Sequence, residues 1–223
     1  MTTPNVTYDS TRTYLVENRK DSYLFRGNEP LKSDGTFAYD DMMSRFKKLA
    51  GEDLTNHKLI DISLIDCTAE FTDLNCEFVA FGQDFNKLFP TPNWPPYFNG
   101  FDVKKEYGST VNKKSGSLIW YPVQGCTDND NCNLVENPQF AFSELVDFLN
   151  ELLNRSKVCI YYHCEHGHDR TSALSAAYMM KYMKVSKNDA LTLSPPKGAK
   201  SFSHPWEVNY KALAEWYAGT IKK

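Results

Sequence analysis

Apolar runs and amphipathic stretches alternate along this chain of 223 residues. Apolar runs bounded by polar and turn residues predict strands at about 23–30, 59–66, 117–123 and 158–164. Apolar positions at helical spacing predict helices at about 42–49, 142–153, 171–183 and 206–217. Because strands alternate with helices, the pattern indicates an α/β fold with a central, mainly parallel sheet, whose ligand site lies at the carboxyl ends of the strands.

The segment 71–117 is the least regular part of the pattern. It is rich in Phe, Asn, Pro, Gly and Lys, and turn residues gather at 91–96 and at 112–116. A structureless loop of this length is unusual in a compact domain. We therefore expect short helices or strands there, together with part of a functional rim.

The composition suits one globular domain spanning residues 1–223, because 41% of the residues are hydrophobic and 14% are aromatic. The formal net charge of −3 gives no basic surplus, so nothing at this level indicates binding to nucleic acid or to an anionic membrane. The first residues lack a basic start and an apolar core, and no apolar run is long enough to be a transmembrane segment. We expect a soluble, cytoplasmic protein, and the sequence leaves the oligomeric state open.

The stretch 158–172 carries the strongest chemical signal. An apolar run ends at Cys164, five residues follow, and Arg170 and Thr171 open a helical pattern. A short loop between a strand and a helix aims successive backbone N–H groups inward, at the positive end of the helix dipole. Such a loop holds a phosphate dianion and favours a thiolate over a thiol. These features make Cys164 the candidate nucleophile and Arg170 the candidate phosphate clamp.

The loop resembles the signature of the cysteine-dependent protein tyrosine and dual-specificity phosphatase superfamily. The residues at that family's spacing are His163, Cys164, Gly167, Arg170 and Thr171. The segment 23–30 is similar to the opening strand and Arg-Gly turn of many dual-specificity phosphatases. The resemblance implies a fold of that family, with four to five mainly parallel strands flanked by helices. A buried cysteine before an ordinary turn, and a sulfurtransferase loop of the rhodanese type, are the weaker interpretations.

In the mechanism that the resemblance implies, the Cys164 thiolate attacks phosphorus and forms a phosphocysteine that water then hydrolyses, with no metal or other cofactor. Arg170 pairs with two phosphate oxygens through its planar guanidinium. The Thr171 hydroxyl donates to the sulfur and helps it leave in the second step. The other loop residues are the candidate substrate-binding residues: Glu165, His166, Gly167, His168 and Asp169.

A general acid must protonate the leaving oxygen and later accept a proton from water. The family places an aspartate for this role somewhat more than about thirty residues before the nucleophile. Asp130 and Asp128 stand 34 and 36 residues before Cys164, directly after a predicted strand. The spacing favours Asp130, with Asp128 close behind. The segment 94–96 resembles part of the Trp-Pro-Asp loop of classical tyrosine phosphatases, but it lacks the aspartate and is interpreted as a turn.

The substrate class is open between two kinds of phosphoester. A phosphotyrosine-containing protein is favoured. However, Asp169 before Arg170 is similar to the loop of the myotubularin lipid phosphatases, and 64–70 weakly resembles a segment of the phosphatase-and-tensin lipid phosphatase. Both hints favour a phosphoinositide or inositol phosphate, whereas the absence of Lys from the loop opposes it. The non-enzyme alternative is an inactive phosphate-binding module, which the intact Cys164 and Arg170 disfavour.

The six cysteines are Cys67, Cys76, Cys126, Cys132, Cys159 and Cys164. A thiolate nucleophile needs a reducing compartment, so we expect mostly free thiols. Cys126 and Cys132 have no second Cys or His pair at zinc spacing, so we expect no metal site. Cys67 stands where the tensin-type phosphatase supplies a resolving thiol, with an inert buried thiol as the alternative. Cys159 should face away from Cys164.

Three histidines lie in or beside the loop. His163 precedes the nucleophile as in the family, where its role is to order the loop. His166 and His168 either add positive charge near the substrate below neutral pH or point to solvent.

Overall fold

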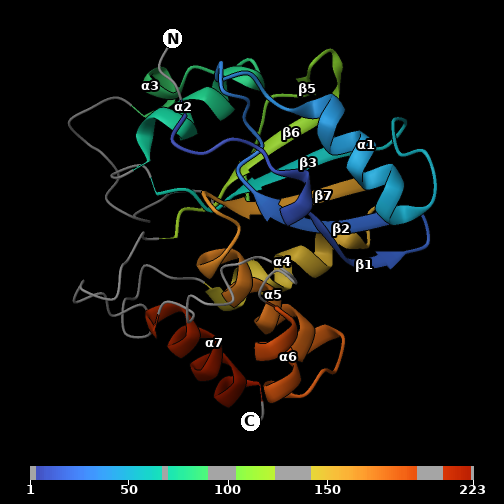
Figure 1. Cartoon of the computed structure of the whole chain (residues 1–223), viewed down its shortest axis with the longest axis vertical. Helices are drawn as coiled ribbons and strands as arrows, with labels where there is room; N and C mark the ends of the chain where they lie inside the picture. Colours follow the sequence, from blue (N-terminus) through green and yellow to red (C-terminus); the bar gives the residue numbers. More distant parts are fainter. Residues whose placement is uncertain (1–3, 67–69, 90–103, 124–141, 195–207, 222–223) are drawn as a thin grey trace.

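The computed structural model describes residues 4–66, 70–89, 104–123, 142–194 and 208–221. These residues form three layers, with a sheet between two groups of helices (Figure 1). The predicted α/β fold class is confirmed.

The sheet has seven strands in the order β1-β2-β7-β3-β6-β4, and β5 pairs with β6. Their bounds are β1 (Tyr14–Arg19), β2 (Ser22–Asn28), β3 (Lys58–Ser63), β4 (Glu106–Tyr107), β5 (Thr110–Val111), β6 (Lys114–Trp120) and β7 (Val158–Cys164). The central strands β2, β7, β3 and β6 are parallel, whereas β1, β4 and β5 are antiparallel to their neighbours. The expected sheet of four to five strands corresponds to this parallel core, which the antiparallel strands extend.

Helices cover both faces of the sheet (Figure 1). One face carries α1 (Tyr39–Ala50), α2 (Phe71–Ala80) and α3 (Phe85–Leu88). The other face carries α4 (Phe142–Leu153), α5 (Asp169–Tyr182), α6 (Lys187–Leu193) and α7 (Val208–Thr220). A short 3-10 helix, η1 (Ser10–Arg12), precedes β1.

Strand β7 sends side chains into both layers, because successive residues of a strand point to opposite faces. All of its residues are buried. Tyr162 and Cys164 pack in the core beneath α4, α5 and α7. Cys159 and Tyr161 pack in the core beneath α1 and α2. Cys159 therefore faces away from Cys164, as predicted.

Two of the predicted helices, α1 and α5, form in the structure. Helix α1 ends at Gly51, which has a φ of 82° and donates its N–H to the carbonyl of Lys47. Only glycine adopts this left-handed conformation readily, so Gly51 stops the helix. Helix α5 is buried along most of its length, as its apolar sequence predicts. It forms the centre of the α4–α7 layer.

The pattern predicts neither β1 nor α6. Nearly all β1 residues are half-buried, so the strand shows no contrast between a core face and a solvent face. Helix α6 spans only 7 residues, too few for a clear helical period.

The segment 71–117 contains α2, α3, β4, β5 and the start of β6, which agrees with the expected short elements. Strand β6 begins earlier than predicted, because Asn112 and Lys113 form the whole turn of the β5–β6 hairpin. Both residues have positive φ, 50° and 61°. That conformation is typical of a two-residue hairpin turn.

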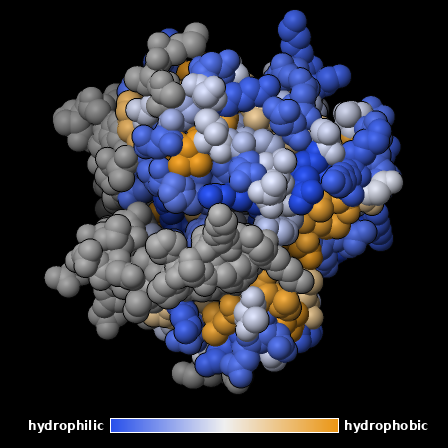
Figure 2. Space-filling model, viewed as in Figure 1, coloured by the Kyte–Doolittle hydropathy of each residue, from blue (hydrophilic) through white to orange (hydrophobic). Residues whose placement is uncertain are grey.

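The face in Figure 2 is mostly hydrophilic over the sheet and more apolar over the part that carries α6 and α7. Exposed apolar side chains in that part include Met183, Leu193 and Trp216. Among the described residues, no helix combines the length and the apolar character that a membrane crossing needs.

Candidate active site

The loop between β7 and α5 has the predicted strand–loop–helix form. Strand β7 ends at Cys164 and α5 begins at Asp169, whose carboxylate lies at the positive end of the helix dipole. Gly167 has a φ of 67°, and a Cβ there would lie 2.5 Å from the carbonyl oxygen of Gly27 in β2. The loop therefore lies against the backbone of β2 so closely that only glycine fits at this position.

Arg26 of β2 holds the loop from behind. Its guanidinium is buried and donates to the Gly167 carbonyl at 2.7 Å and to the Ser172 hydroxyl at 3.1 Å. It also donates to Ser175 Oγ at 2.8 Å and to the carbonyl of Ser194. Burial lowers the pKa of Arg26. Sequence reasoning noted Arg26 only within an Arg-Gly turn and gave it no role.

Cys164 and Thr171 lie in contact at the base of the loop. Cys164 is 2% exposed, and the Thr171 hydroxyl donates to its sulfur at 3.1 Å. Thr171 is in the first turn of α5, so the sulfur also lies near the amino end of that helix. A donated O–H and the helix dipole both stabilise negative charge on sulfur.

Arg170 is held by a carboxylate that the sequence analysis did not identify. Glu70, which precedes α2, accepts from Arg170 Nη1 at 2.6 Å and from Nη2 at 2.5 Å. The two side chains are only 9% and 6% exposed. Burial would raise the pKa of Glu70, but the bonds and charge of Arg170 lower it below its usual value. Arg170 thus presents a fixed guanidinium beside the cysteine.

Glu165 adds a second carboxyl to this pair. Burial first, and then the neighbouring Glu70, raise the pKa of Glu165 to about 7. Its backbone carbonyl accepts from the N–H of Glu29 at 3.2 Å, which joins the loop to the end of β2.

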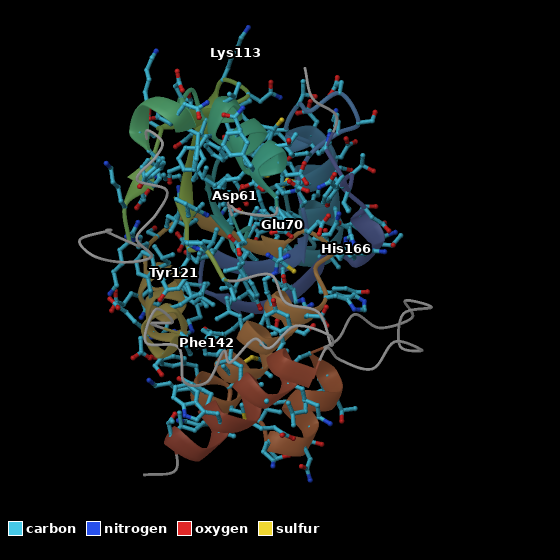
Figure 3. The ribbon with its side chains drawn as sticks, turned by 90° about the vertical axis from the view of Figure 1, so that its left-hand side faces the viewer. Asp61, Glu70, Lys113, Tyr121, Phe142 and His166 are labelled. Atoms are coloured by element: carbon cyan, nitrogen blue, oxygen red, sulfur yellow. The ribbon has the colours of Figure 1, made fainter. Side chains whose placement is uncertain are left out.

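The loop histidines differ in their surroundings. His166 is exposed and His168 is half-buried, and desolvation lowers the pKa of both. They therefore carry positive charge only at a pH lower than free histidine requires. Arg12 of η1 donates to the His166 carbonyl at 3.1 Å and brings a permanent positive charge to the loop. Figure 3 shows His166 on one side of the molecule, away from the labelled Asp61 at its centre.

His163 points to the opposite face of the sheet from Cys164. It is buried beneath α2, where its Nε2 lies 3.4 Å from Asp61 Oδ1 and 3.4 Å from Glu77 Oε1. Among the described residues, these three side chains form the one group of potential metal ligands. The backbone carbonyl of His163 accepts from the N–H of Leu64 at 2.9 Å, so His163 also links β7 to the end of β3 beside the loop.

Several predicted residues lie outside the described part of the chain. They are the candidate acids Asp128 and Asp130, the candidate resolving thiol Cys67, the thiols Cys126 and Cys132, and the turn at 94–96. Within the described part, Cys76, Cys159 and Cys164 are free thiols. Lys104 pairs with Glu144 and Glu151 of α4 at 3.6 and 3.5 Å.

The family model of the dual-specificity phosphatase catalytic domain matches residues 99–203, which include the whole loop. This match supports an assignment to the dual-specificity phosphatase superfamily. The resemblance seen in the loop residues is thereby confirmed. A search of curated proteins finds no match.

Several solved structures resemble the chain at low identity. Tk-PTP in its active form has 9% identity and a TM-score of 0.47, over 94% of this chain and 98% of its own. Human DUSP28 has 12% identity and a TM-score of 0.45, over 90% of each chain. PTPMT1 in complex with PI(5)P has 14% identity and a TM-score of 0.45, over 95% of this chain and 97% of its own. At such low similarity, these structures carry no information about the substrate of this chain.

Proposed function

We propose that this protein is a cysteine-dependent phosphatase that hydrolyses phosphoesters through a phosphocysteine on Cys164. The observation that carries the proposal is the buried Cys164 sulfur that accepts from Thr171 at 3.1 Å, in a loop whose arginine is fixed by a carboxylate. The superfamily assignment supports a phosphorylated substrate. We favour a phosphotyrosine-containing protein.

In the proposed reaction, the Cys164 sulfur attacks phosphorus while the bond to the leaving oxygen breaks. Arg170 holds two phosphate oxygens, and the Thr171 hydroxyl donates to the sulfur when water displaces it. The loop backbone between Glu165 and Asp169 surrounds the phosphate. The free thiols of the described residues are consistent with work in a reducing compartment such as the cytoplasm.

Replacement of the nucleophile tests the mechanism. Cys164→Ser should abolish turnover yet keep the fold and the binding of a phosphate analogue, because a hydroxyl is a far weaker nucleophile in an unchanged loop. Cys159→Ser is the matched control, since it removes a buried thiol from the opposite face of the same strand. Turnover that survives in Cys164→Ser would contradict the mechanism. Wild-type protein that binds the analogue but turns over no phosphoester would indicate a phosphate-binding module.

Asp130 is proposed as the general acid and Asp128 as its alternative. Asp130→Asn should lower kcat by roughly 100-fold for phosphotyrosine, a poor leaving group, and less for activated aryl phosphates. Asp128→Asn, two residues away, should do much less. The reverse order of the two variants would assign the acid to Asp128.

A phosphoinositide or inositol phosphate is the second candidate substrate. Arg12, whose side chain is 34% exposed, reaches the loop at His166 and could pair with a second phosphate. Turnover of phosphotyrosine and phosphoserine peptides, phosphoinositides and inositol phosphates should therefore be compared in wild type and Arg12→Ala. A loss in Arg12→Ala confined to multiply phosphorylated substrates would favour the second candidate, whereas equal rates of wild type and Arg12→Ala on every substrate would favour the first.

A further inference from the structure

Three ionisable side chains meet on the face of the sheet opposite the catalytic cysteine. Asp61 comes from β3, His163 from the neighbouring β7, and Glu77 from α2, which covers both strands. Each side chain is 0% exposed. Figure 3 shows Asp61 near the centre of the molecule in that view. This cluster lies next to the loop, because His163 immediately precedes Cys164.

The polar atoms of the cluster have no hydrogen-bond partner among the residues that the structure describes. This holds for both carboxylate oxygens of Asp61 and Glu77 and for both ring nitrogens of His163. Buried polar atoms are almost always satisfied, since an unsatisfied one costs about 1–3 kcal/mol and more when charged. Six such atoms in one place indicate a missing partner.

The distances within the cluster fit a bound ion better than direct hydrogen bonds. His163 Nε2 lies 3.4 Å from an oxygen of Asp61 and 3.4 Å from an oxygen of Glu77. A hydrogen bond between charged groups is shorter, at about 2.7–2.9 Å. Two ligand atoms that are each about 2.0–2.1 Å from a tetrahedral Zn²⁺ lie roughly 3.3–3.4 Å apart.

The charge of the cluster points the same way. Two carboxylates and one imidazole share a space without solvent, and further acids, Asp73 and Glu29, lie beside Glu77. The nearby cation Arg170 pairs with Glu70 and therefore does not balance the charge of this cluster. A divalent cation would balance both carboxylates and leave His163 as a neutral ligand.

We propose that Asp61, Glu77 and His163 form a structural binding site for one tetrahedral divalent transition-metal ion, with Zn²⁺ as the best fit. The three side chains would supply three ligands, and one water molecule would complete the four-fold coordination. The ion would tie β3, β7 and α2 together directly behind the catalytic loop. The expectation of no metal site rested on cysteine and histidine spacing, whereas these ligands come from three separate elements. The ion would bind here whether or not the protein is an active phosphatase.

Cobalt substitution tests the proposal. The full chain carrying Cys164→Ser, which removes the active-site thiolate, is unfolded and refolded with Co²⁺ or with Zn²⁺. The expected result is one ion per chain, the visible absorption of four-coordinate Co²⁺ without a thiolate charge-transfer band, and a higher Tm for the loaded than for the metal-free protein. Absence of a stoichiometric ion, or a six-coordinate or thiolate spectrum, would overturn the site even if no ligand variant folds.

Ligand variants then locate the ion. Asp61→Asn and Glu77→Gln should each weaken binding by roughly 100-fold or more, because loss of an outer partner of a ligand already costs about 10- to 100-fold. Asp73→Asn is the matched control, since it removes another carboxyl from the same helix outside the cluster. Equal metal affinity in Asp61→Asn, Glu77→Gln and Asp73→Asn would place the ion elsewhere. Protein that folds stably and takes up no ion would show that shared protons alone balance the cluster.

Discussion

Two arginine–glutamate pairs, one under the loop and one at the edge of the sheet, reach the same shortest N–O distance in different surroundings. Under the loop, Arg170 and Glu70 approach to 2.5 Å with side chains 9% and 6% exposed. At the edge, Arg155 and Glu106 also approach to 2.5 Å, but with side chains 44% and 24% exposed. Solvent screens the edge pair, and water can hydrate either partner when the other is removed. Water cannot replace either partner of the buried loop pair. The buried loop pair, which makes two hydrogen bonds, therefore fixes a site, whereas the exposed edge pair, which makes one, adds little stability.

The loop pair is also part of a rigid frame. Arg26 holds the Gly167 carbonyl from behind, and Glu70 holds Arg170 from the side. Glu106, on the edge strand β4, accepts from Lys58 and Ser117 as well as from Arg155, but the side chains of Lys58 and Arg155 are partly exposed. We expect variants of the loop frame to change activity and stability together, and variants of the edge to change stability alone.

The largest effect is expected for Gly167→Ala. The new Cβ would be 2.5 Å from the backbone of Gly27, at a position with a φ of 67°. Strain and overpacking together should lower the free energy of unfolding by roughly 4 kcal/mol and abolish most turnover. Chemical denaturation and kcat measure both effects.

Gly51→Ala is the matched control for Gly167→Ala. Gly51 has a similar φ of 82°, but a Cβ there meets nothing within 4 Å. The control should lose only about 1 kcal/mol and keep its kcat. Equal losses in the two variants would show that backbone strain, and not contact with β2, sets the cost at Gly167.

Glu70→Gln breaks the loop pair and keeps its shape. Arg170 would stay buried without a counter-charge, which should cost about 3 kcal/mol of stability. A guanidinium displaced by about 1 Å can lose roughly 100-fold in kcat. Denaturation together with kcat and KM measures the change, and Glu70→Asp should recover part of the kcat. A Glu70→Gln variant with wild-type kcat would show that the loop alone positions Arg170.

Glu165 gives the loop a pH dependence near neutral pH, where the edge carboxylate Glu106 stays charged. Its pKa is raised to about 7, so the protonated form stabilises the fold at low pH and this contribution is lost as the pH rises through about 7. Wild-type protein should therefore lose stability between about pH 5 and pH 8, and Glu165→Gln should lose less over the same window. Urea midpoints at several pH values test this. Parallel curves for the two proteins would mean that Glu77 and His163, whose pKa values are also raised, dominate the dependence.

The sequence predicts the loop better than the frame that holds it. Cys164, Gly167, Arg170 and Thr171 are near neighbours in the chain, so their spacing and the flanking strand and helix reveal their arrangement. The frame depends on partners far apart, because Glu70 pairs with a residue 100 positions away and Arg26 with Ser175, 149 positions away.

A sequence also does not show that these long-range partners are buried. Glu70 and Asp61 look like solvated surface carboxylates in a one-dimensional pattern, and only the packing of α2 on the sheet buries them. Strand β1 is missed for a related reason, since its half-buried residues show no alternation.

The smallest effect is expected for Glu106→Gln. Burial raises the pKa of Glu106, but its three hydrogen-bond donors have the larger combined effect and lower the pKa to about 2. The stability that this carboxylate contributes is thus present above its unfolded pKa and is lost as the pH falls through about 2. Because the donors Lys58 and Arg155 are partly exposed, the loss at neutral pH should be less than about 1 kcal/mol, with kcat unchanged and most of the difference removed by high salt. A loss as large as that of Glu70→Gln, or a change in kcat, would mean that the edge pair supports the loop through β3 and β7, and the contrast between the two pairs would not hold.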